Sequence, residues 1–405
     1  MEELAQQEEH FVGFTHGLVR LTPGSWFLPA AFTNFADKIY NFQWRTDDVL
    51  VMAYPRSGTS WLQEVVWTMK NNPDLENPMA DMPLLARSPY VDMDMMMDGK
   101  KMPPLTPDNP LLQGFIKMCP GGNPADGVNL QLTAATPSPR IIKTHLPLSL
   151  LHPSLLDTLK VVYVARNPKD VVVSLHHHCR LLKTLDYSGT LEQFVKYFVD
   201  DDVVYGPYWQ HVKEAWTKRE ASNLHFVFYE DLKADPASEL KRLSVFLGCN
   251  LAKDQMEKLI RHTSFAEMQA RDNVMGVKAA ENPVMNQAWS GGRRLLQEGE
   301  VAAGSPPPEG GQAKTEGVLK LQAPALLNLR TSAYPPACFI DTERLVCVTC
   351  TRRPCSVIFQ IFFYKHVPVD PHPTEKMPAM NQAASATRRS ERPHSPPLPT
   401  GHCSV

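Results

Sequence analysis

Residues 56–60, with the sequence Arg-Ser-Gly-Thr-Ser, combine the groups that bind a phosphate or a sulfate. Three hydroxyl groups and consecutive backbone N–H groups can donate hydrogen bonds, the glycine lets the backbone come close, and Arg56 adds a fixed charge with a forked donor pattern. An apolar run at residues 49–54 precedes them and Trp61 opens an amphipathic run, which predicts a strand, a tight loop and a helix start. The alternative is an ordinary strand–turn–helix junction without a ligand.

A second candidate pair, Lys143 and His145, alternates with Thr144 in an extended run, so both side chains lie on one face of it. A neighbouring cation favours the neutral form of a histidine, which makes His145 a candidate general base. Taken alone, a Lys-x-His pair is more often a coincidence on a protein surface than a functional site.

Arg166 and Ser174 form a third candidate site. Arg166 ends an apolar run, and Ser174 lies on the helix that the following residues predict. Both are expected near the carboxyl edge of a sheet, where they could hold a second phosphate; the alternative for Arg166 is a solvated side chain.

Two histidine- or cysteine-rich segments raise the question of a metal. Residues 176–178 are all histidine, but neighbours on a helix point about 100° apart and cannot converge on one ion. Cys347 and Cys350 form a C-x-x-C with Cys355 and His366 downstream, in flanks that lack the regular spacing of zinc sites. We expect no metal.

Strand-like and helix-like runs alternate up to residue 287. Asn167 and Pro168 suit the N-cap and first position of one helix, and Asp235 and Pro236 those of another, which Gly248 would end. Apolar strands alternating with amphipathic helices predict an α/β fold, a parallel sheet covered on both faces. Ligands of such sheets bind beyond the carboxyl ends of the strands.

The composition changes near residue 287. We expect residues 1–29 to form an N-terminal segment and residues 30–287 a folded domain, in which residues 92–139 are a long irregular excursion. Residues 288–405 hold 15 of the 36 prolines and are expected to be a largely disordered, low-complexity tail.

Bulk properties exclude several classes of protein. A net charge of −2 argues against nucleic-acid binding, and no apolar run approaches the roughly 20 residues of a membrane helix. The acidic N-terminus lacks the apolar region of a signal peptide. Before residue 288 the cysteines are only Cys119, Cys179 and Cys249, which suits a reducing compartment. We therefore expect a cytoplasmic protein.

Five segments together resemble the cytosolic sulfotransferase family, in the family's order and over roughly residues 30–287. They are YPRSGTSW, similar to the phosphosulfate-binding loop, RIIKTHLP, similar to the catalytic strand segment, VVYVARNPKDVVVSLHHH, similar to the 3′-phosphate-binding strand and helix, and FVFYEDL and HTSFAEM, similar to two later cofactor-contact motifs. The resemblance implies an α/β fold that binds 3′-phosphoadenosine 5′-phosphosulfate (PAPS) and moves its sulfuryl group to a small acceptor without a metal.

The resemblance also implies roles for individual residues. His145 corresponds to the general base, Arg56 stands where the family usually has a lysine at the leaving phosphate, and Lys143 would help to neutralise the sulfuryl group. Phe32 aligns with an aromatic residue of the acceptor pocket. The residues implied to bind the nucleotide are Arg56, Ser57, Gly58, Thr59, Ser60, Trp61, Arg166, Ser174, Tyr229, Thr263, Ser264 and Phe265.

The chain departs from the family in its second half and in one loop. The span before Lys143 is longer than usual for the family, and the resemblance implies that its extra length, in residues 92–139, lies near the acceptor site of the sulfotransferase domain. The closing pattern Arg-Lys-Gly-x-x-Gly-x-Trp-Lys is missing after Gln287, and so is the motif of the family's homodimer. A catalytically weak or inactive nucleotide-binding relative is therefore one alternative. A small-metabolite kinase is another, which the absence of the Walker pattern Gly-x-x-x-x-Gly-Lys-Ser/Thr disfavours.

Overall fold

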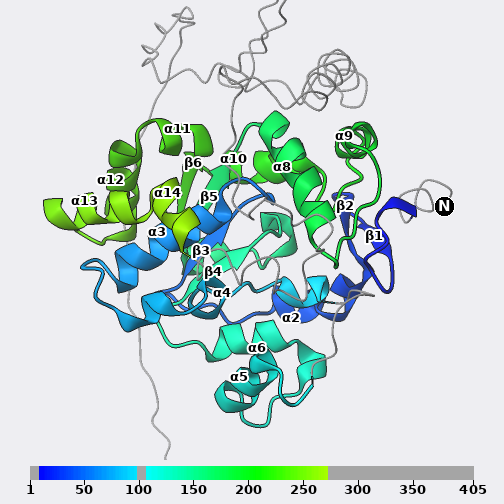
Figure 1. The fold of residues 1–405 in the computed structure, drawn as a ribbon, viewed down its shortest axis with the longest axis horizontal. Coiled ribbons are helices and arrows are strands. Elements are labelled where there is room, and N and C mark those ends of the chain that lie inside the picture. The colour runs from blue at the N-terminus through cyan, green and yellow to red at the C-terminus, as the bar shows by residue number, and fades with distance from the viewer. Residues whose placement is uncertain (1–8, 98–105, 272–405) are drawn as a thin grey trace, which may run out of the picture. The chain divides into compact units, whose positions relative to one another are not determined.

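A parallel sheet forms the centre of the fold (Figure 1). The structure, a computed structural model, describes residues 9–97 and 106–271. The strand order of the parallel sheet is β4-β3-β5-β6, and Val51 of β3 lies opposite Lys143 of β4 and Val162 of β5. A separate antiparallel hairpin pairs β1 with β2. The strands are β1 (Leu18–Leu21), β2 (Trp26–Pro29), β3 (Val49–Met52), β4 (Ile141–Thr144), β5 (Lys160–Ala165) and β6 (Leu224–Phe228).

Helices cover both faces of this sheet, which confirms the predicted α/β class. The α-helices are α2 (Ala36–Tyr40), α3 (Thr59–Asn71), α4 (Leu84–Arg87), α5 (Pro110–Met118), α6 (Val128–Ala135), α7 (Leu155–Thr158), α8 (Pro168–Leu181), α9 (Leu191–Val199), α10 (Tyr208–Thr217), α11 (Tyr229–Ala234), α12 (Pro236–Leu247), α13 (Lys253–His262) and α14 (Phe265–Ala270). Short 3₁₀ helices are η1 (Ala30–Asn34), η2 (Pro78–Asp81), η3 (Met93–Met96), η4 (Pro124–Asp126) and η5 (Leu148–Leu150).

The side chains of β3 are buried on both sides of the sheet. Leu50 and Met52 pack into a core that also holds residues of α8, α9 and α10. Val49 and Val51 pack into the opposite core, with residues of α3, α12 and α13, and Figure 1 shows α12 and α13 on the other side of the sheet from α8 and α9. Burial on both faces explains why the strand is a continuous apolar run rather than an alternating one.

The predicted helix ends are confirmed where capping residues mark them. The Asn167 side chain accepts a hydrogen bond from the Lys169 backbone at the start of α8, and Asp235 accepts one from Ser238 at the start of α12. Gly248 ends α12 in the left-handed region at φ +70°, which glycine adopts without strain. These caps fix where each helix leaves the sheet.

A buried ion pair joins the starts of β3 and β4. Arg140 donates from Nε to Oδ1 of Asp48 at 2.7 Å and from Nη2 to Oδ2 at 2.5 Å. The guanidinium also donates to the carbonyls of Gln43 and Thr133, so each of its three nitrogens has an acceptor inside the protein. The pair fixes the two strands that carry the anion loop and the candidate base.

The expectation of an irregular excursion at residues 92–139 is wrong for its described part. It contains η3, α5, η4 and α6. Asn109 caps α5 by accepting a hydrogen bond from Leu111, and the apolar residues Leu111, Leu112 and Phe115 recur at helical spacing. Pro110 stands at the first position of α5 and Gly127 at the N-cap of α6, where a helix tolerates such residues, whereas Gly114 lies inside α5.

Other predictions lie partly or wholly outside the described residues. These are the tail at residues 288–405 and its cysteine pair at 347 and 350, and the missing closing pattern after Gln287. Within residues 9–97 and 106–271, no helix is both long and apolar enough to cross a membrane.

Candidate active site

The loop between β3 and α3 has two residues in the left-handed region of backbone conformation. Arg56 lies at φ +68° and Gly58 at φ +106°, and α3 begins at the next residue, Thr59. A Cβ atom on Gly58 would lie 2.8 Å from Cδ2 of Tyr229, so only glycine fits there. The first N–H groups of α3 therefore open directly onto the loop, as an anion site requires.

Three buried polar atoms around this loop have no hydrogen-bond partner among the described residues. They are Oγ of Ser57, Oγ1 of Thr59 and Nε of Arg166. Buried polar atoms are nearly always paired, so unpaired donors gathered at a helix N-terminus fit a ligand that accepts hydrogen bonds. The predicted anion site has the donors that such a ligand needs.

Two arginines converge on the loop. Arg56 donates from Nε to Oγ of Ser174 at 3.0 Å, and Arg166 donates from Nη1 to the backbone oxygen of Arg56 at 3.2 Å. Burial and the neighbouring charge of Arg166 lower the pKa of Arg56 to about 10. Two buried cations this close favour an anion between or beside them.

Aromatic rings form a wall on the other side of Gly58. The guanidinium carbon of Arg166 lies 4.4 Å from the Tyr229 ring centroid, and Tyr229 meets Trp61 edge-on at 5.7 Å between centroids. Trp61 also packs against Leu84 and Met268. A flat ligand attached to the bound anion would find an apolar surface here.

Thr263, Ser264 and Phe265 lie at the junction of α13 and α14. Thr263 is buried, and Ser264 caps α14. The contact that ties this junction to α3 is between Nε2 of His262 and the Glu64 carboxylate at 3.2 Å. The structure thus brings the junction to α3, but no hydrogen bond joins these three described residues to residues 56–60.

His145 stands where β4 ends, beside the first residue after β3. Its Nδ1 lies 2.7 Å from the carbonyl oxygen of Ala53. A carbonyl only accepts, so Nδ1 carries the proton and Nε2 has a free lone pair. Burial and the charge of Lys143 lower the pKa of His145 well below its usual value. The imidazole is therefore neutral and able to accept a proton.

Lys143 adds a third cation to the site. Its Nζ lies 4.3 Å from the ring centroid of Tyr90. Burial, together with the charge of Arg56, lowers the pKa of Lys143 to about 8, although the carboxylate of Asp92 acts in the opposite direction. Lys143 is thus an ammonium ion at neutral pH that can lose its proton on the alkaline side.

The family model of the sulfotransferase domain matches residues 46–294, from just before β3 to beyond α14. This chain belongs to the sulfotransferase family. Sulfotransferase 1A1 of Mus musculus is 37% identical over 256 residues, which cover 63% of this chain and 74% of the relative. Sulfotransferase 1C2 of Oryctolagus cuniculus is 32% identical over 249 residues, covering 61% and 74%.

Two solved structures of retinol dehydratase are similar to this sulfotransferase. One, in complex with retinol and PAP, has a TM-score of 0.63 and 29% identity, covering 79% of this chain and 93% of that one. The other, in complex with androsterone and the inactive cofactor PAP, has a TM-score of 0.63 and 28% identity, covering 87% and 96%.

The sequence predictions missed His178 as part of the sulfotransferase site. It lies one helical turn after Ser174, and its Nδ1 is buried without a partner among the described residues. Burial and the charges of Arg56 and Lys143 lower its pKa well below the usual value. The spacing of four residues from Ser174 was the available signal. His176, in contrast, packs against the ring of Phe194.

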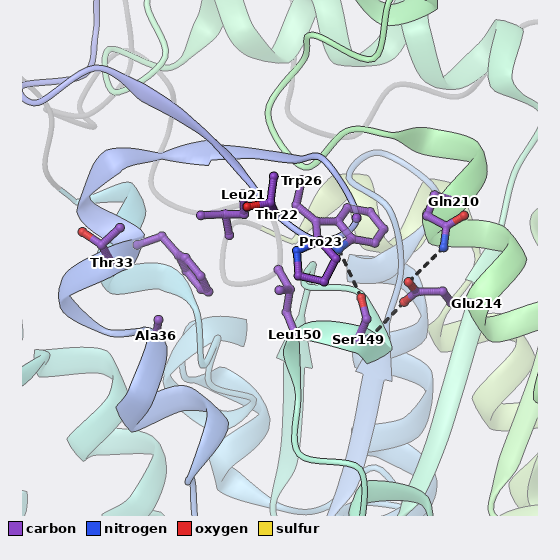
Figure 2. A pocket seen from close by; sticks show the side chains of 12 residues that line it. Leu21, Thr22, Pro23, Trp26, Thr33, Ala36, Ser149, Leu150, Gln210 and Glu214 are labelled. Carbon is purple, nitrogen blue, oxygen red and sulfur yellow. Dashed lines mark hydrogen bonds between the residues drawn. The ribbon is translucent and has the colours of Figure 1, made fainter. Parts of the chain in front are cut away.

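Phe32 lines a hollow of about 540 Å³, part of which is drawn in Figure 2. Figure 2 shows Trp26, Ser149 and Glu214 around the hollow, and the Trp26 indole donates to Oγ of Ser149 at 3.1 Å. Neither His145 nor Lys143 lines it. No group of three or more side chains that could hold a metal ion is found in the part of the sulfotransferase that the structure describes.

Proposed function

We propose that this chain transfers the sulfuryl group of PAPS to a hydroxyl or amine of a small acceptor, such as a phenol, an alcohol or a steroid, with His145 as general base. One observation carries the proposal: Nδ1 of His145 is held 2.7 Å from the carbonyl of Ala53, the residue that leads into the anion loop. A base and an anion-binding loop on adjacent strand ends suit a transfer between an anionic donor and a protic acceptor.

The proposed transfer is one in-line displacement at sulfur, in which each site residue has a separate role. The acceptor oxygen or nitrogen forms a bond to sulfur, its proton passes to Nε2 of His145, and the bond from sulfur to the bridging phosphate oxygen breaks. Arg56 and the N-terminal N–H groups of α3 stabilise the charge that develops on the leaving phosphate. Lys143 balances the charge of the sulfuryl oxygens.

The remaining predicted residues would hold the nucleotide of PAPS. The rings of Trp61 and Tyr229 suit the adenine, and Arg166 with Ser174 suits the 3′-phosphate. The junction at residues 263–265 would complete the wall, and Phe32 would border the acceptor's entrance. PAP in both retinol dehydratase complexes, with retinol in one and androsterone in the other, supports a nucleotide donor and a small apolar acceptor.

Product analysis tests this proposal directly. The full chain is incubated with PAPS and, in parallel, with ATP and magnesium. Each donor is tested with a phenol, a primary alcohol and a steroid alcohol, and the products are identified by mass spectrometry. We expect sulfated product with PAPS and no phosphorylated product with ATP. Phosphorylated product would favour the kinase alternative and overturn the proposal.

Calorimetry with PAP separates an active enzyme from a weak relative. An intact donor site binds PAP at micromolar or tighter affinity. Loss of two charge-assisted contacts, at about 1.5–3 kcal/mol each, would weaken binding by roughly a hundredfold or more. Tight PAP binding without sulfated product would assign the defect to the acceptor side, whereas weak binding would assign it to the nucleotide clamp.

A further inference from the structure

We propose that Asp92 is the positioning residue of this site: its buried carboxylate fixes the backbone of the segment that carries the base and supplies the negative charge that keeps Lys143 an ammonium ion. The inference deepens the proposed function and rests on it, because Lys143 and His145 take their roles from that reaction.

The segment before Asp92 meets β4 in an isolated parallel bridge. The Lys143 backbone donates to the carbonyl of Pro89 at 2.8 Å, and Val91 donates to the carbonyl of Lys143 at 3.0 Å. This pairing sets Tyr90 beside Lys143 in a parallel bridge. Two residues further, Asp92 therefore reaches the end of β4, where the base is.

The Asp92 carboxylate accepts hydrogen bonds from three directions. Oγ1 of Thr144 donates to Oδ1 at 2.8 Å, and the hydroxyl of Tyr205 donates to Oδ2 at 2.9 Å. The backbone N–H of His145 points at both oxygens, at 3.4 Å each. Asp92 is fully buried and forms no ion pair within the described residues. A buried carboxylate held only by neutral donors is costly for stability, so a function is the better explanation of its presence.

Two phenols join this carboxylate to the cation and the base. Because Tyr205 donates its proton to Asp92, the short hydrogen bond between the two hydroxyls is donated by Tyr90. The ring face of Tyr90 carries Nζ of Lys143, and both rings stand edge-on to the His145 imidazole, at 5.4 and 5.6 Å between centroids. Carboxylate, phenols, ammonium and imidazole are thus one packed unit.

The charged groups of this unit shift the pKa values of one another. Burial raises the pKa of Asp92 to about 6, against the hydrogen bonds of Thr144 and Tyr205 and the charge of Lys143, which all lower it. Lys143, with its pKa near 8, is faced by the Asp92 carboxylate and by the cation Arg56. Between about pH 6 and about pH 8, Asp92 is therefore a carboxylate and Lys143 an ammonium ion, while His145 remains neutral.

The test is the pH profile of kcat/KM for PAPS with a phenol acceptor. In the wild type we expect an acid limb near pH 6 from Asp92 and an alkaline limb near pH 8 from Lys143. In Asp92→Asn the acid limb disappears, and the alkaline limb moves down because Lys143 loses the charge that holds its proton. A limb lower by about one pH unit corresponds to a roughly tenfold fall at pH 8.5.

Asp94→Asn is the matched control. Asp94 lies in the same segment and is also buried, but its carboxylate accepts from the backbones of Asn129 and Leu130, so neither limb should move. Thr144→Val and Tyr205→Phe keep the Asp92 charge, and each removes one hydrogen bond to the carboxylate. Because these hydrogen bonds lower the pKa of Asp92, each variant should shift the acid limb to higher pH and leave the alkaline limb in place.

Each outcome decides for or against the proposal. Unchanged limbs in folded Asp92→Asn overturn it, whatever the loss of kcat, because a merely structural residue would lower the rate at every pH alike. If Asp92→Asn does not fold, Thr144→Val and Tyr205→Phe decide, and an unmoved acid limb in both overturns it. A wild type without sulfated product would overturn the proposed function itself, whereas product with unmoved limbs overturns the role of Asp92 alone.

Discussion

Nδ1 of His145 and the carbonyl oxygen of Ala53 lie 2.7 Å apart, which ties the end of β4 to the first residue after β3. The contact fixes which ring nitrogen carries the proton and turns the other toward the site. His211 strengthens the arrangement, because its Nε2 donates to the carbonyl of His145 at 2.9 Å while its Nδ1 accepts from Tyr163. The base is thus held from its ring and from its backbone.

Replacing this base should abolish transfer and leave donor binding intact. In His145→Ala we expect kcat to fall by about 10²–10⁴-fold, the range of a positioned general base, while PAP affinity stays within about twofold. Steady-state assays and calorimetry measure the two quantities. His152→Ala, on an exposed histidine, is the control and should match the wild type. Wild-type kcat in His145→Ala would exclude His145 as the base.

Arg56→Lys should retain activity with an altered rate. Lysine keeps the charge but lacks the Nε group that donates to Oγ of Ser174 at 3.0 Å. We expect kcat or the PAPS affinity to change by about three- to tenfold. Because the two side chains touch, Arg56→Lys and Ser174→Ala should be non-additive in a double-mutant cycle. A lysine variant equal to the wild type in both quantities would show that this position does not tune the reaction.

Gly58→Ala should weaken PAP binding. The new Cβ would meet Tyr229 at 2.8 Å at a residue with φ +106°, so the loop or the aromatic wall must shift. Strain of about 1–3 kcal/mol corresponds to a roughly 5–150-fold weaker Kd, measured by calorimetry. Gly114→Ala, in α5 with no atom within 4 Å of the new Cβ, is the control and should bind as the wild type does. Equal affinities in the two variants would show that the close packing of Gly58 against Tyr229 does not shape the PAP site.

Local patterns were enough to predict the elements that position the donor loop. The apolar run of β3, the cap at Asn167 and the stop at Gly248 each depend on residues within one element, and each is found as predicted. The helices within residues 92–139 were missed because prolines and glycines at their ends outweighed a short apolar spacing.

The partners of the base could not be predicted in the same way. Tyr90 and Tyr205 meet across 115 positions in the sequence, and Asp92 reaches Tyr205 across 113. Such contacts follow from tertiary packing, which no periodicity encodes. His178 was missed for another reason: the three adjacent histidines were considered only as metal ligands, whereas the charges of Arg56 and Lys143 act on His178.

The buried pair of Asp48 and Arg140 should dominate stability near the site. Asp48→Ala leaves the guanidinium of Arg140 buried without its carboxylate, and we expect a loss of about 3–5 kcal/mol in the free energy of unfolding. The exposed pair of Lys38 and Asp126 is the matched comparison, and Asp126→Ala should lower the free energy of unfolding far less than Asp48→Ala does. Urea denaturation followed by circular dichroism measures both. Equal losses would mean that Arg140 finds water or another acceptor once Asp48 is gone, and that the pair is not what joins β3 to β4.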